Sequence, residues 1–222
     1  MDIQIEDFKR IRRKDCLEYS IFDSKYGTDT GNPLRVSMDG RNEICPGEID
    51  NTDVYYDSQG YQTSALGHID IINNFLKENI DDLNKYSFVD IGCGKGRVII
   101  QTLFTNNIYK DYCGIEIDKE IYTIFKKNIN AIKSSVDTSK VKIILQNALD
   151  YQCISVPTVY FLFEPFGSDT YIEFFKNNKN ILENNDTIIV NISWIEKNIQ
   201  SVENLKGFTN IYKNFIINIY KN

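Results

Sequence analysis

Three glycines alternate with other residues in the stretch VDIGCGKGR, residues 89–97, which directly follows an apolar run. Glycines let a backbone approach a ligand closely, so this stretch predicts a cofactor or nucleotide site. A phosphate-binding P-loop needs GxxxxGK followed by Ser or Thr, but Gly94-Lys95 is followed by Gly96. The dinucleotide fingerprint GxGxxG does not fit either, because Gly92, Gly94 and Gly96 are spaced one residue more tightly. That spacing leaves no obvious seat for a pyrophosphate.

The elements that must position these glycines alternate between β and α from residue 86 onward. Continuously apolar strands separated by helices predict a parallel sheet covered on both faces. The expected strands are residues 86–92, 111–118, 141–146, 158–163 and 187–193, and the expected helices are 97–104, 119–133, 169–182 and 195–205.

The C-terminal stretch FTNIYKNFIINIYKN differs, because two β-prone runs follow one another with only Lys213 and Asn214 available for a turn. No crossover helix fits between them, so we expect an antiparallel hairpin at one side of the sheet. The predicted fold is α/β: a Rossmann-like, seven-stranded, mostly parallel sheet with an antiparallel C-terminal strand pair and helices on both faces.

The pattern Asp-x-Gly-x-Gly-x-Gly, from Asp90 to Gly96, resembles motif I of class I S-adenosylmethionine-dependent methyltransferases. The resemblance spans about residues 60–220 and includes the seven-strand plan. It implies S-adenosylmethionine as the cofactor. The carboxylate of Asp90 would engage the amino end of the cofactor, and Gly92, Gly94 and Gly96 would let the backbone approach its methionine moiety.

Two later positions extend the resemblance. Glu116 is expected to end the second strand, where the family has an acid that binds both ribose hydroxyls. Asp118 is its nearby competitor, and Ile117 between them is included in the expected cofactor site. After the third strand, Asn147 and Ala148 match the family's Asn-Ala, which implies that they lie near the adenine amino group.

The stretch EPFG, residues 164–167, follows the fourth strand, at the sheet edge where ligands bind in open α/β folds. It resembles the Asn-Pro-Pro-Tyr/Phe motif of methyltransferases that act on planar nitrogens, but it has Glu in place of Asn and one proline fewer. We expect Glu164 to orient the methyl acceptor or take its proton, and Phe166 to bound the acceptor pocket. Glu164 is also included in the expected cofactor site. Pro165 should hold Glu164 in an extended conformation. The alternative is that Glu164 stabilises a helix N-terminus beside Ser168.

The chain is also similar to a bacterial subgroup distantly related to the non-SET histone lysine methyltransferases. In that subgroup the positions of Tyr61 and Thr63 would approach the methionine end of the cofactor. Residues 22–31, FDSKYGTDTG, resemble an entry segment of the subgroup, in which Tyr26, Asp29 and Thr30 are candidate lid residues or parts of an ordinary turn.

The helix expected after the glycines opens with Lys95 and Arg97. Arg97 has two possible roles: it pairs with an acid of the lid, or it is exposed.

We divide the chain into a lid-like N-terminal segment, residues 1–62, and a cofactor-binding domain, residues 63–222. A helix is expected over residues 63–83, capped by Ser64, with Leu66, Ile69, Ile72, Phe75 and Leu76 on one face. The first twenty residues should form a basic amphipathic helix. Its charges are either a solvated face or a patch for an anionic acceptor.

The overall composition suits one domain of 222 residues with a net charge of −6. That charge disfavours a protein that binds nucleic acid through bulk electrostatics. No apolar run approaches the roughly 18–20 residues of a membrane helix, and we expect a cytoplasmic protein. Five cysteines and one histidine, His68, give no zinc signature, so no metal is expected.

The sequence therefore predicts a methyltransferase whose acceptor is a protein lysine, a small metabolite or a glycan intermediate. A non-catalytic cofactor-binding or scaffold protein on the same fold and an NAD-dependent oxidoreductase are the alternatives.

Overall fold

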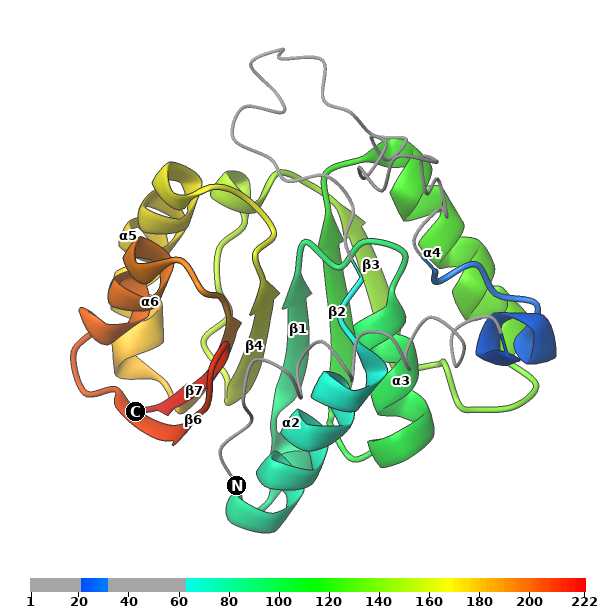
Figure 1. Cartoon of the computed structure of the whole chain (residues 1–222), viewed down its shortest axis with the longest axis horizontal. Coiled ribbons are helices and arrows are strands. Elements are labelled where there is room, and N and C mark those ends of the chain that lie inside the picture. The colour runs from blue at the N-terminus through cyan, green and yellow to red at the C-terminus, as the bar shows by residue number, and fades with distance from the viewer. Residues whose placement is uncertain (1–20, 32–62) are drawn as a thin grey trace.

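The structure is a computed structural model that describes residues 21–31 and 63–222. It contains a seven-stranded sheet of order β3-β2-β1-β4-β5-β7-β6 (Figure 1). The strands are β1 Ser87–Ile91, β2 Asp111–Glu116, β3 Val141–Leu145, β4 Thr158–Phe163, β5 Thr187–Ile192, β6 Thr209–Lys213 and β7 Ile217–Lys221. The helices are α2 Leu66–Asn79, α3 Arg97–Asn106, α4 Lys119–Ile132, α5 Ser168–Asn184 and α6 Glu196–Glu203. Two short 3₁₀ turns lie at Leu83–Lys85 and Ala148–Asp150.

Strands β1 to β5 pair in parallel, and β7 pairs antiparallel with both β5 and β6. The predicted fold is confirmed. The strand order changes direction between β1 and β4. From β1 the sheet continues through β2 and β3 on one side, and from β4 it continues through β5 on the other. In open α/β sheets the loops at such a switch point leave a crevice at the carboxyl ends of the strands.

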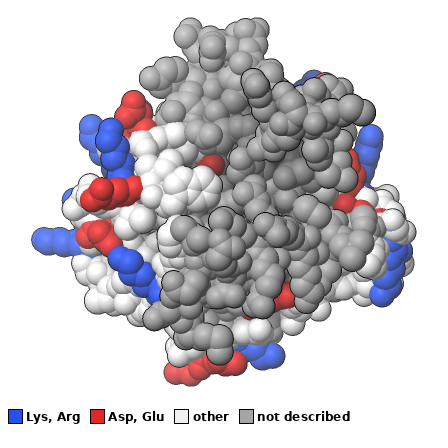
Figure 2. Space-filling model, viewed as in Figure 1, with Lys and Arg blue, Asp and Glu red and all other residues white. Residues whose placement is uncertain are grey.

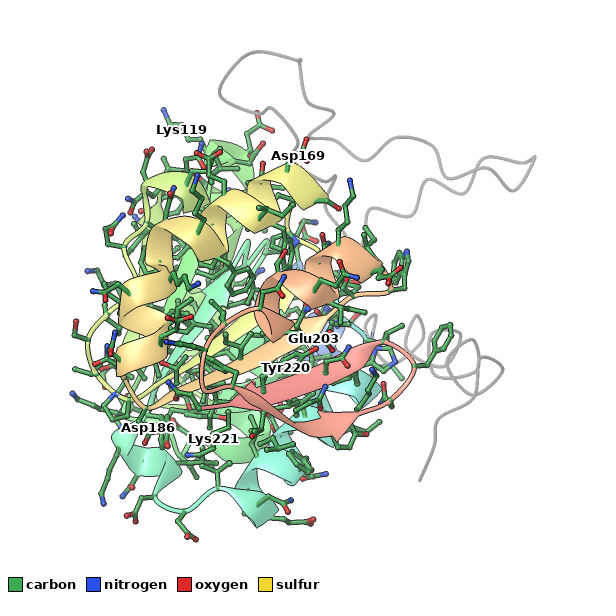
Figure 3. The ribbon with its side chains drawn as sticks, turned by 90° about the vertical axis from the view of Figure 1, so that its left-hand side faces the viewer. Lys119, Asp169, Asp186, Glu203, Tyr220 and Lys221 are labelled. Carbon is green, nitrogen blue, oxygen red and sulfur yellow. The ribbon has the colours of Figure 1, made fainter. Side chains whose placement is uncertain are left out.

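Two apolar layers cover the sheet because successive strand residues point to opposite faces. Phe88 and Phe161 pack in a core with α2, α3 and α4, whereas Val89 and Tyr160 pack in a second core with α5 and α6. Figure 3 shows α5 and α6 lying across the second face. Strands β1 and β5 are buried at every position, as expected for the centre of a sheet covered on both sides.

Helix α2 is shorter than the sequence predicted. The carbonyl of Ala65 accepts the first hydrogen bonds, from the N–H groups of His68 and Ile69, so Ala65 and not Ser64 is the N-cap. The helix ends at Asn79, and the chain then turns through Asp82 at a positive φ of 55°. The predictions of a Ser64 cap and of a helix reaching residue 83 are therefore wrong.

The C-terminal hairpin is present, but its turn lies later than expected. Lys213 belongs to β6, and the turn is formed by residues 214–216. The Asn214 side chain closes it by accepting hydrogen bonds from the N–H groups of Ile216 and Ile217, at 3.1 and 2.8 Å. This amide mimics a backbone turn, which is why Asn is favoured at such positions.

A polar contact ties the C-terminal strand to the rest of the sheet at the edge opposite the crevice. The Tyr86 hydroxyl donates to Asp186 at 2.5 Å, and Lys221 lies 3.2 Å from the same carboxylate. Asp186 and Lys221 lie side by side in Figure 3. Burial and the neighbouring Asp186 both raise the pKa of Tyr86, so the hydroxyl remains a donor at physiological pH.

Acidic and basic side chains are interspersed on the described surface that Figure 2 shows, with no field of a single sign. Within the described residues, no helix combines the length and the apolar character that crossing a membrane requires.

Candidate functional site

The loop between β1 and α3 carries the three glycines, and all three have positive φ. Gly92 is the most constrained. A Cβ there would lie 2.3 Å from Cβ of Pro165, which follows β4. The glycine therefore lets the loops after β1 and β4 touch at the switch point, as well as providing the left-handed conformation. Gly96 plays a similar part against the ring of Phe125, where a Cβ would lie at 2.1 Å.

Asp90 lies on β1, just before this loop, and is only 3% exposed. Its Oδ2 atom is buried without a hydrogen-bond partner among the described residues. Burial, together with the nearby Glu116, raises the pKa of Asp90 well above its usual value. A buried carboxylate oxygen without a donor is costly, so this atom indicates a place where a ligand donor can bind.

A narrow recess lies beside Asp90, between the β1–α3 loop and the start of α2. It is lined by Thr63, Ser64, Asp90, Gly92, Cys93, Gly94, Arg97, Val98, Phe161 and Phe163. Its interior volume is about 20 Å³, room for about one water molecule. Thr63 thus lines a recess beside the glycine loop, and its contact with a cofactor stays a prediction. Tyr61 lies outside the described residues.

Glu116 ends β2, as the sequence predicted. Its carboxylate accepts three backbone hydrogen bonds of 2.9 Å each, from Gly94, Ile117 and Asp118. These bonds oppose the effect of burial, which is the larger influence and raises its pKa. Asp118 has a different task, because its Oδ1 caps α4 by accepting from two N–H groups of the first turn. Glu116 is thus held beside the glycine loop, whereas the Asp118 carboxylate is engaged at the start of α4.

Asn147 follows β3 at the same edge of the sheet. Its side-chain oxygen accepts a hydrogen bond of 2.9 Å from the N–H of Leu149 and so caps the 3₁₀ turn that begins at Ala148. Asn147, Ala148 and Ile117 are all partly exposed. Glu116 and Asn147 come from neighbouring strands, which pair Glu116 with Leu145. Both residues therefore lie at the same edge of the sheet, where the sequence predicted contacts with the nucleoside.

Glu164 follows β4 and has a φ of +39°, which is rare for a residue with a side chain. The expectation of an extended residue before Pro165 is therefore wrong. Tertiary contacts override the local preference. The Ser193 hydroxyl donates to Oε1 of Glu164 at 2.8 Å, and the backbone N–H of Trp194 also hydrogen-bonds to this carboxylate. Strain of this kind persists where the surroundings impose it, commonly at functional sites.

The Glu164 carboxylate is half-buried, and its burial raises its pKa despite the two hydrogen bonds. These bonds come from the β5–α6 loop, not from the start of α5, whose N-cap is Gly167. The observed contacts therefore give no support to the alternative that Glu164 serves the helix terminus.

Ser193 and Trp194 are site residues that the sequence reasoning missed. Ser193 is fully buried, and its hydroxyl also accepts from the N–H of Ile195 at 3.0 Å. Trp194 is 52% exposed beside Glu164, although large aromatic residues are usually buried. The available signal was positional: Ser-Trp directly follows a buried strand at the carboxyl edge of the sheet.

Phe166 packs in the core beside the start of α5. It is buried in the second core, with its ring centroid 5.3 Å from Tyr171 and 6.1 Å from Phe174. This packing is that of a core residue that fixes the start of α5. A direct contact with an acceptor stays a prediction.

Residues 21–31 dock beside the glycine loop through the two basic residues of GKGR. Lys95 pairs with Asp29 at 2.8 Å and donates to the Gly31 carbonyl at 3.2 Å. Nε of Arg97 donates to the Thr30 carbonyl at 2.9 Å. Arg97 is 3% exposed, so the alternative that it is an exposed residue is wrong.

Asn128 of α4 completes this docking. Its amide donates to the carbonyl of Asp29 at 2.9 Å and accepts from the N–H of the same residue at 2.8 Å. Asp23 closes the segment from within by binding Thr28, Thr30 and Gly31. Of the three lid candidates, Asp29 and Thr30 therefore make contacts close to the glycine loop, whereas Tyr26 packs against Phe104.

The described cysteines, Cys93, Cys113 and Cys153, are free thiols. Burial raises the pKa of Cys113 to about 11 and that of Cys153 to about 12, which makes both poor nucleophiles. Within the ranges 21–31 and 63–222, no cluster of histidine, cysteine or acidic residues could hold a metal ion.

Comparisons with known proteins agree on the fold. No protein-family model matches the chain, and no curated protein matches its sequence significantly. Among solved structures, the yhhF protein of Escherichia coli, assigned as a methyltransferase, superposes with a TM-score of 0.53 at 15% identity, covering 74% of this chain and 89% of that one. Magnesium protoporphyrin IX methyltransferase from Synechocystis PCC 6803, with bound S-adenosylhomocysteine, gives 0.51 at 10% identity, covering 76% and 89%.

An assigned RNA methyltransferase from Pyrococcus horikoshii gives a TM-score of 0.53 at 14% identity, covering 78% of this chain and 89% of that one. Identities this low establish shape and not activity. The chain therefore has the Rossmann-like fold shared by class I S-adenosylmethionine-dependent methyltransferases.

Proposed function

We propose that this chain is an S-adenosylmethionine-dependent methyltransferase. The observation that carries the proposal is the Oδ2 atom of Asp90, buried without a described partner beside a glycine-lined recess at the switch point of the sheet. The ammonium group of a cofactor's methionine end is the kind of donor that such a carboxylate binds.

The remaining residues fit the other parts of the cofactor. Glu116 lies at the end of β2, where its carboxylate can also accept from ribose hydroxyls. Asn147 and Ala148 lie at the end of the next strand, suited to a neutral base. Gly92 and Gly96 already pack against neighbouring residues without room for a Cβ, so the loop is fixed in shape before a ligand binds. When bound, the cofactor would supply an electrophilic methyl group.

Glu164 is our candidate for handling the acceptor. It follows β4 directly, next to Pro165, which lies against Gly92 of the β1–α3 loop, and Ser193 holds its carboxylate in place. A carboxylate with a raised pKa is a stronger base, so Glu164 can orient an amine or hydroxyl and accept its proton. The proposed acceptor is one of the three that the sequence predicted: a protein lysine, a small metabolite or a glycan intermediate.

Calorimetric titration with S-adenosylmethionine, S-adenosylhomocysteine and NAD tests the cofactor. We expect binding of both sulfur compounds and none of NAD, because the order of β7 and β6 and the glycine spacing both differ from dinucleotide-binding folds. Binding of NAD alone would favour an oxidoreductase. Binding of neither sulfur compound would overturn the proposal.

Methyl transfer from labelled S-adenosylmethionine to protein, small-molecule and glycan fractions tests catalysis and separates an enzyme from a scaffold. Glu164→Gln should keep cofactor affinity and lose about 10²–10⁴-fold in rate if Glu164 is a general base. The matched control is Glu203→Gln, which changes a carboxylate near Tyr220, 3.4 Å from its hydroxyl, and should leave the rate unchanged. Figure 3 shows that pair beside α6. An unchanged rate in Glu164→Gln would remove the base role.

The pH profile offers a second check on Glu164. Because its pKa is raised, the active carboxylate should be lost as the pH falls through a value above the usual 4.5. The acid limb of the wild-type rate profile should be missing in Glu164→Gln.

A further inference from the structure

We propose that the methyl acceptor is an alkylamine that arrives as its ammonium ion, and that the Trp194 indole and the Glu164 carboxylate bind it together. The inference rests on the proposed function and deepens it. It narrows the acceptor to compounds that carry an aliphatic amine, whether on a protein lysine or on a small metabolite, and sets aside a glycan hydroxyl. It also makes Trp194 a residue that determines specificity.

The first support is a carboxylate without a positive partner. Glu164 accepts hydrogen bonds from the Ser193 hydroxyl, at 2.8 Å, and from the N–H of Trp194. Among the described residues, no lysine or arginine forms an ion pair with it. A half-buried charge is costly until an opposite charge reaches it. An ammonium ion supplies that charge, whereas a neutral sugar hydroxyl does not.

The second support is the exposed indole. Trp194 is 52% exposed. In residues 21–31 and 63–222, no other ring pairs with this indole and no cation lies over its face. The face of a tryptophan ring attracts cations more strongly than that of any other aromatic side chain. The indole therefore offers a cation a binding surface that the described fold does not use.

The third support is the placement of these groups in one loop. The N–H of Trp194 bonds to the Glu164 carboxylate, so the indole belongs to a residue that holds this carboxylate. The neighbouring Ser193 also donates to Ile216 through its N–H, at 2.9 Å, which joins the loop to the turn between β6 and β7. Phe215 in that turn is 49% exposed. Exposed aromatic residues next to a carboxylate suit an organic ammonium ion.

The same carboxylate can prepare the amine for transfer. An ammonium nitrogen has no lone pair, so one proton must leave it first. Glu164 takes this proton, and burial raises the pKa of its carboxyl group, which makes it a better acceptor. The nitrogen lone pair then forms the bond to the methyl carbon and displaces the sulfur, which keeps the electron pair of the broken S–C bond. The products are a methylated ammonium ion and a neutral thioether, and Glu164 later releases its proton to water.

Ligand-observed NMR on the full chain, saturated with S-adenosylhomocysteine, tests recognition without turnover. The probes are two cations, butylammonium and tetramethylammonium, and the neutral 1-butanol. We expect both cations to bind at least about 10-fold more tightly than 1-butanol, because only they carry a charge for the carboxylate and the indole. Equal affinities, or a preference for 1-butanol, would overturn the inference.

Variants then separate the two binding groups. Trp194→Leu keeps an apolar side chain but removes the ring, so it should weaken butylammonium about 2- to 30-fold and change 1-butanol less than about 2-fold. Trp194→Phe should restore part of the loss. Both variants keep the backbone N–H that holds Glu164, and an exposed indole has little packing to lose. Equal losses for cation and alcohol in Trp194→Leu, or no loss for either, would contradict the proposal.

The carboxylate is tested in the same way. Glu164→Gln should weaken butylammonium about 10-fold or more, as expected for a lost charge-assisted contact. The matched control is Glu196→Gln, which removes an exposed carboxylate two residues after Trp194 and should leave the affinity unchanged. A loss in Glu196→Gln as large as in Glu164→Gln would show that the general charge of the region attracts the cation, against the proposal.

Methyl transfer distinguishes the sources of the amine. The chain is given labelled S-adenosylmethionine with butylamine, with a peptide that contains one lysine, or with methyl glucoside. Methylation of butylamine or of the peptide supports the inference and identifies a small amine or a protein as the source. Methylation of the glucoside and of neither amine overturns it. If the chain did not bind S-adenosylhomocysteine, the proposed function would fail and the inference with it, whereas binding without a preference for amines removes the inference alone.

Discussion

Asp90 and Glu116 lie near the carboxyl ends of the neighbouring strands β1 and β2, and the two carboxylates have opposite surroundings. Glu116 is satisfied by three backbone N–H groups, whereas Oδ2 of Asp90 has no partner among the described residues. A carboxylate left in this state costs stability, and such costs commonly mark residues kept for binding rather than for folding.

Asp90→Asn should stabilise the unliganded protein at neutral pH. The folded-state pKa of Asp90 is raised, so the folded chain holds a proton that the unfolded chain has released, and wild-type stability falls as the pH rises from about 3.8 through that raised value. The variant has no such fall. We expect its Tm at pH 7 to rise by about 2–4 °C for each kcal/mol gained, with loss of cofactor binding.

Thermal unfolding between pH 4 and pH 8, measured for both proteins, checks this expectation. Asp70→Asn is the control, because Asp70 is a partly exposed residue of α2 that accepts one hydrogen bond from Gln101. Parallel stability curves for wild type and Asp90→Asn would contradict the argument.

At the scale of elements, the loops after β1 and β4 are joined by the contact between Gly92 and Pro165. The sequence predicted every strand and helix of the sheet domain because their apolar runs and helical spacing are local signals. It did not predict the conformation of Glu164, because Ser193 and Trp194, which hold it, lie 29 and 30 residues away. The predicted positions of the α2 N-cap and of the hairpin turn were wrong by one or two residues, because several polar residues near each boundary could serve equally well.

Gly92→Ala should destabilise the fold more than Gly207→Ala. Both glycines have positive φ, but a Cβ at Gly92 would lie 2.3 Å from Pro165, whereas at Gly207 the nearest atom is 3.9 Å away. The backbone cost of about 1–2 kcal/mol applies to both, and overpacking adds about 1–3 kcal/mol at Gly92 alone. Urea unfolding of the two variants measures the difference in the free energy of unfolding. Equal losses in the two variants would show that the loops after β1 and β4 can move apart at no cost in free energy.

At the scale of the whole molecule, residues 21–31 pack against the sheet domain. Phe22 and Tyr26 pack on Phe104 of α3, and Asn128 of α4 binds both backbone groups of Asp29. The sequence identified this segment but could not place it, because its partners are about 70 to 100 residues away along the chain.

Asn128→Ala should loosen this segment. The side chain is buried and makes hydrogen bonds to Asp29 and to the Lys95 carbonyl, so its loss should cost about 1–3 kcal/mol. Tryptic cleavage after Lys25, an exposed residue of the segment, should then be faster than in wild type. Asn180→Ala is the control, since Asn180 is exposed on α5. Unchanged cleavage in Asn128→Ala would mean that the other contacts hold the segment alone.

Trp194 gives the protein an optical reporter at its candidate acceptor site. It is the single tryptophan of the chain, it is 52% exposed, and its backbone N–H is bonded to the Glu164 carboxylate. Its fluorescence therefore comes from one loop at the carboxyl edge of the sheet. A compound that binds in this region would shift the emission wavelength of Trp194 without any added label. Acceptors can therefore be screened by tryptophan fluorescence before any methyl group is transferred.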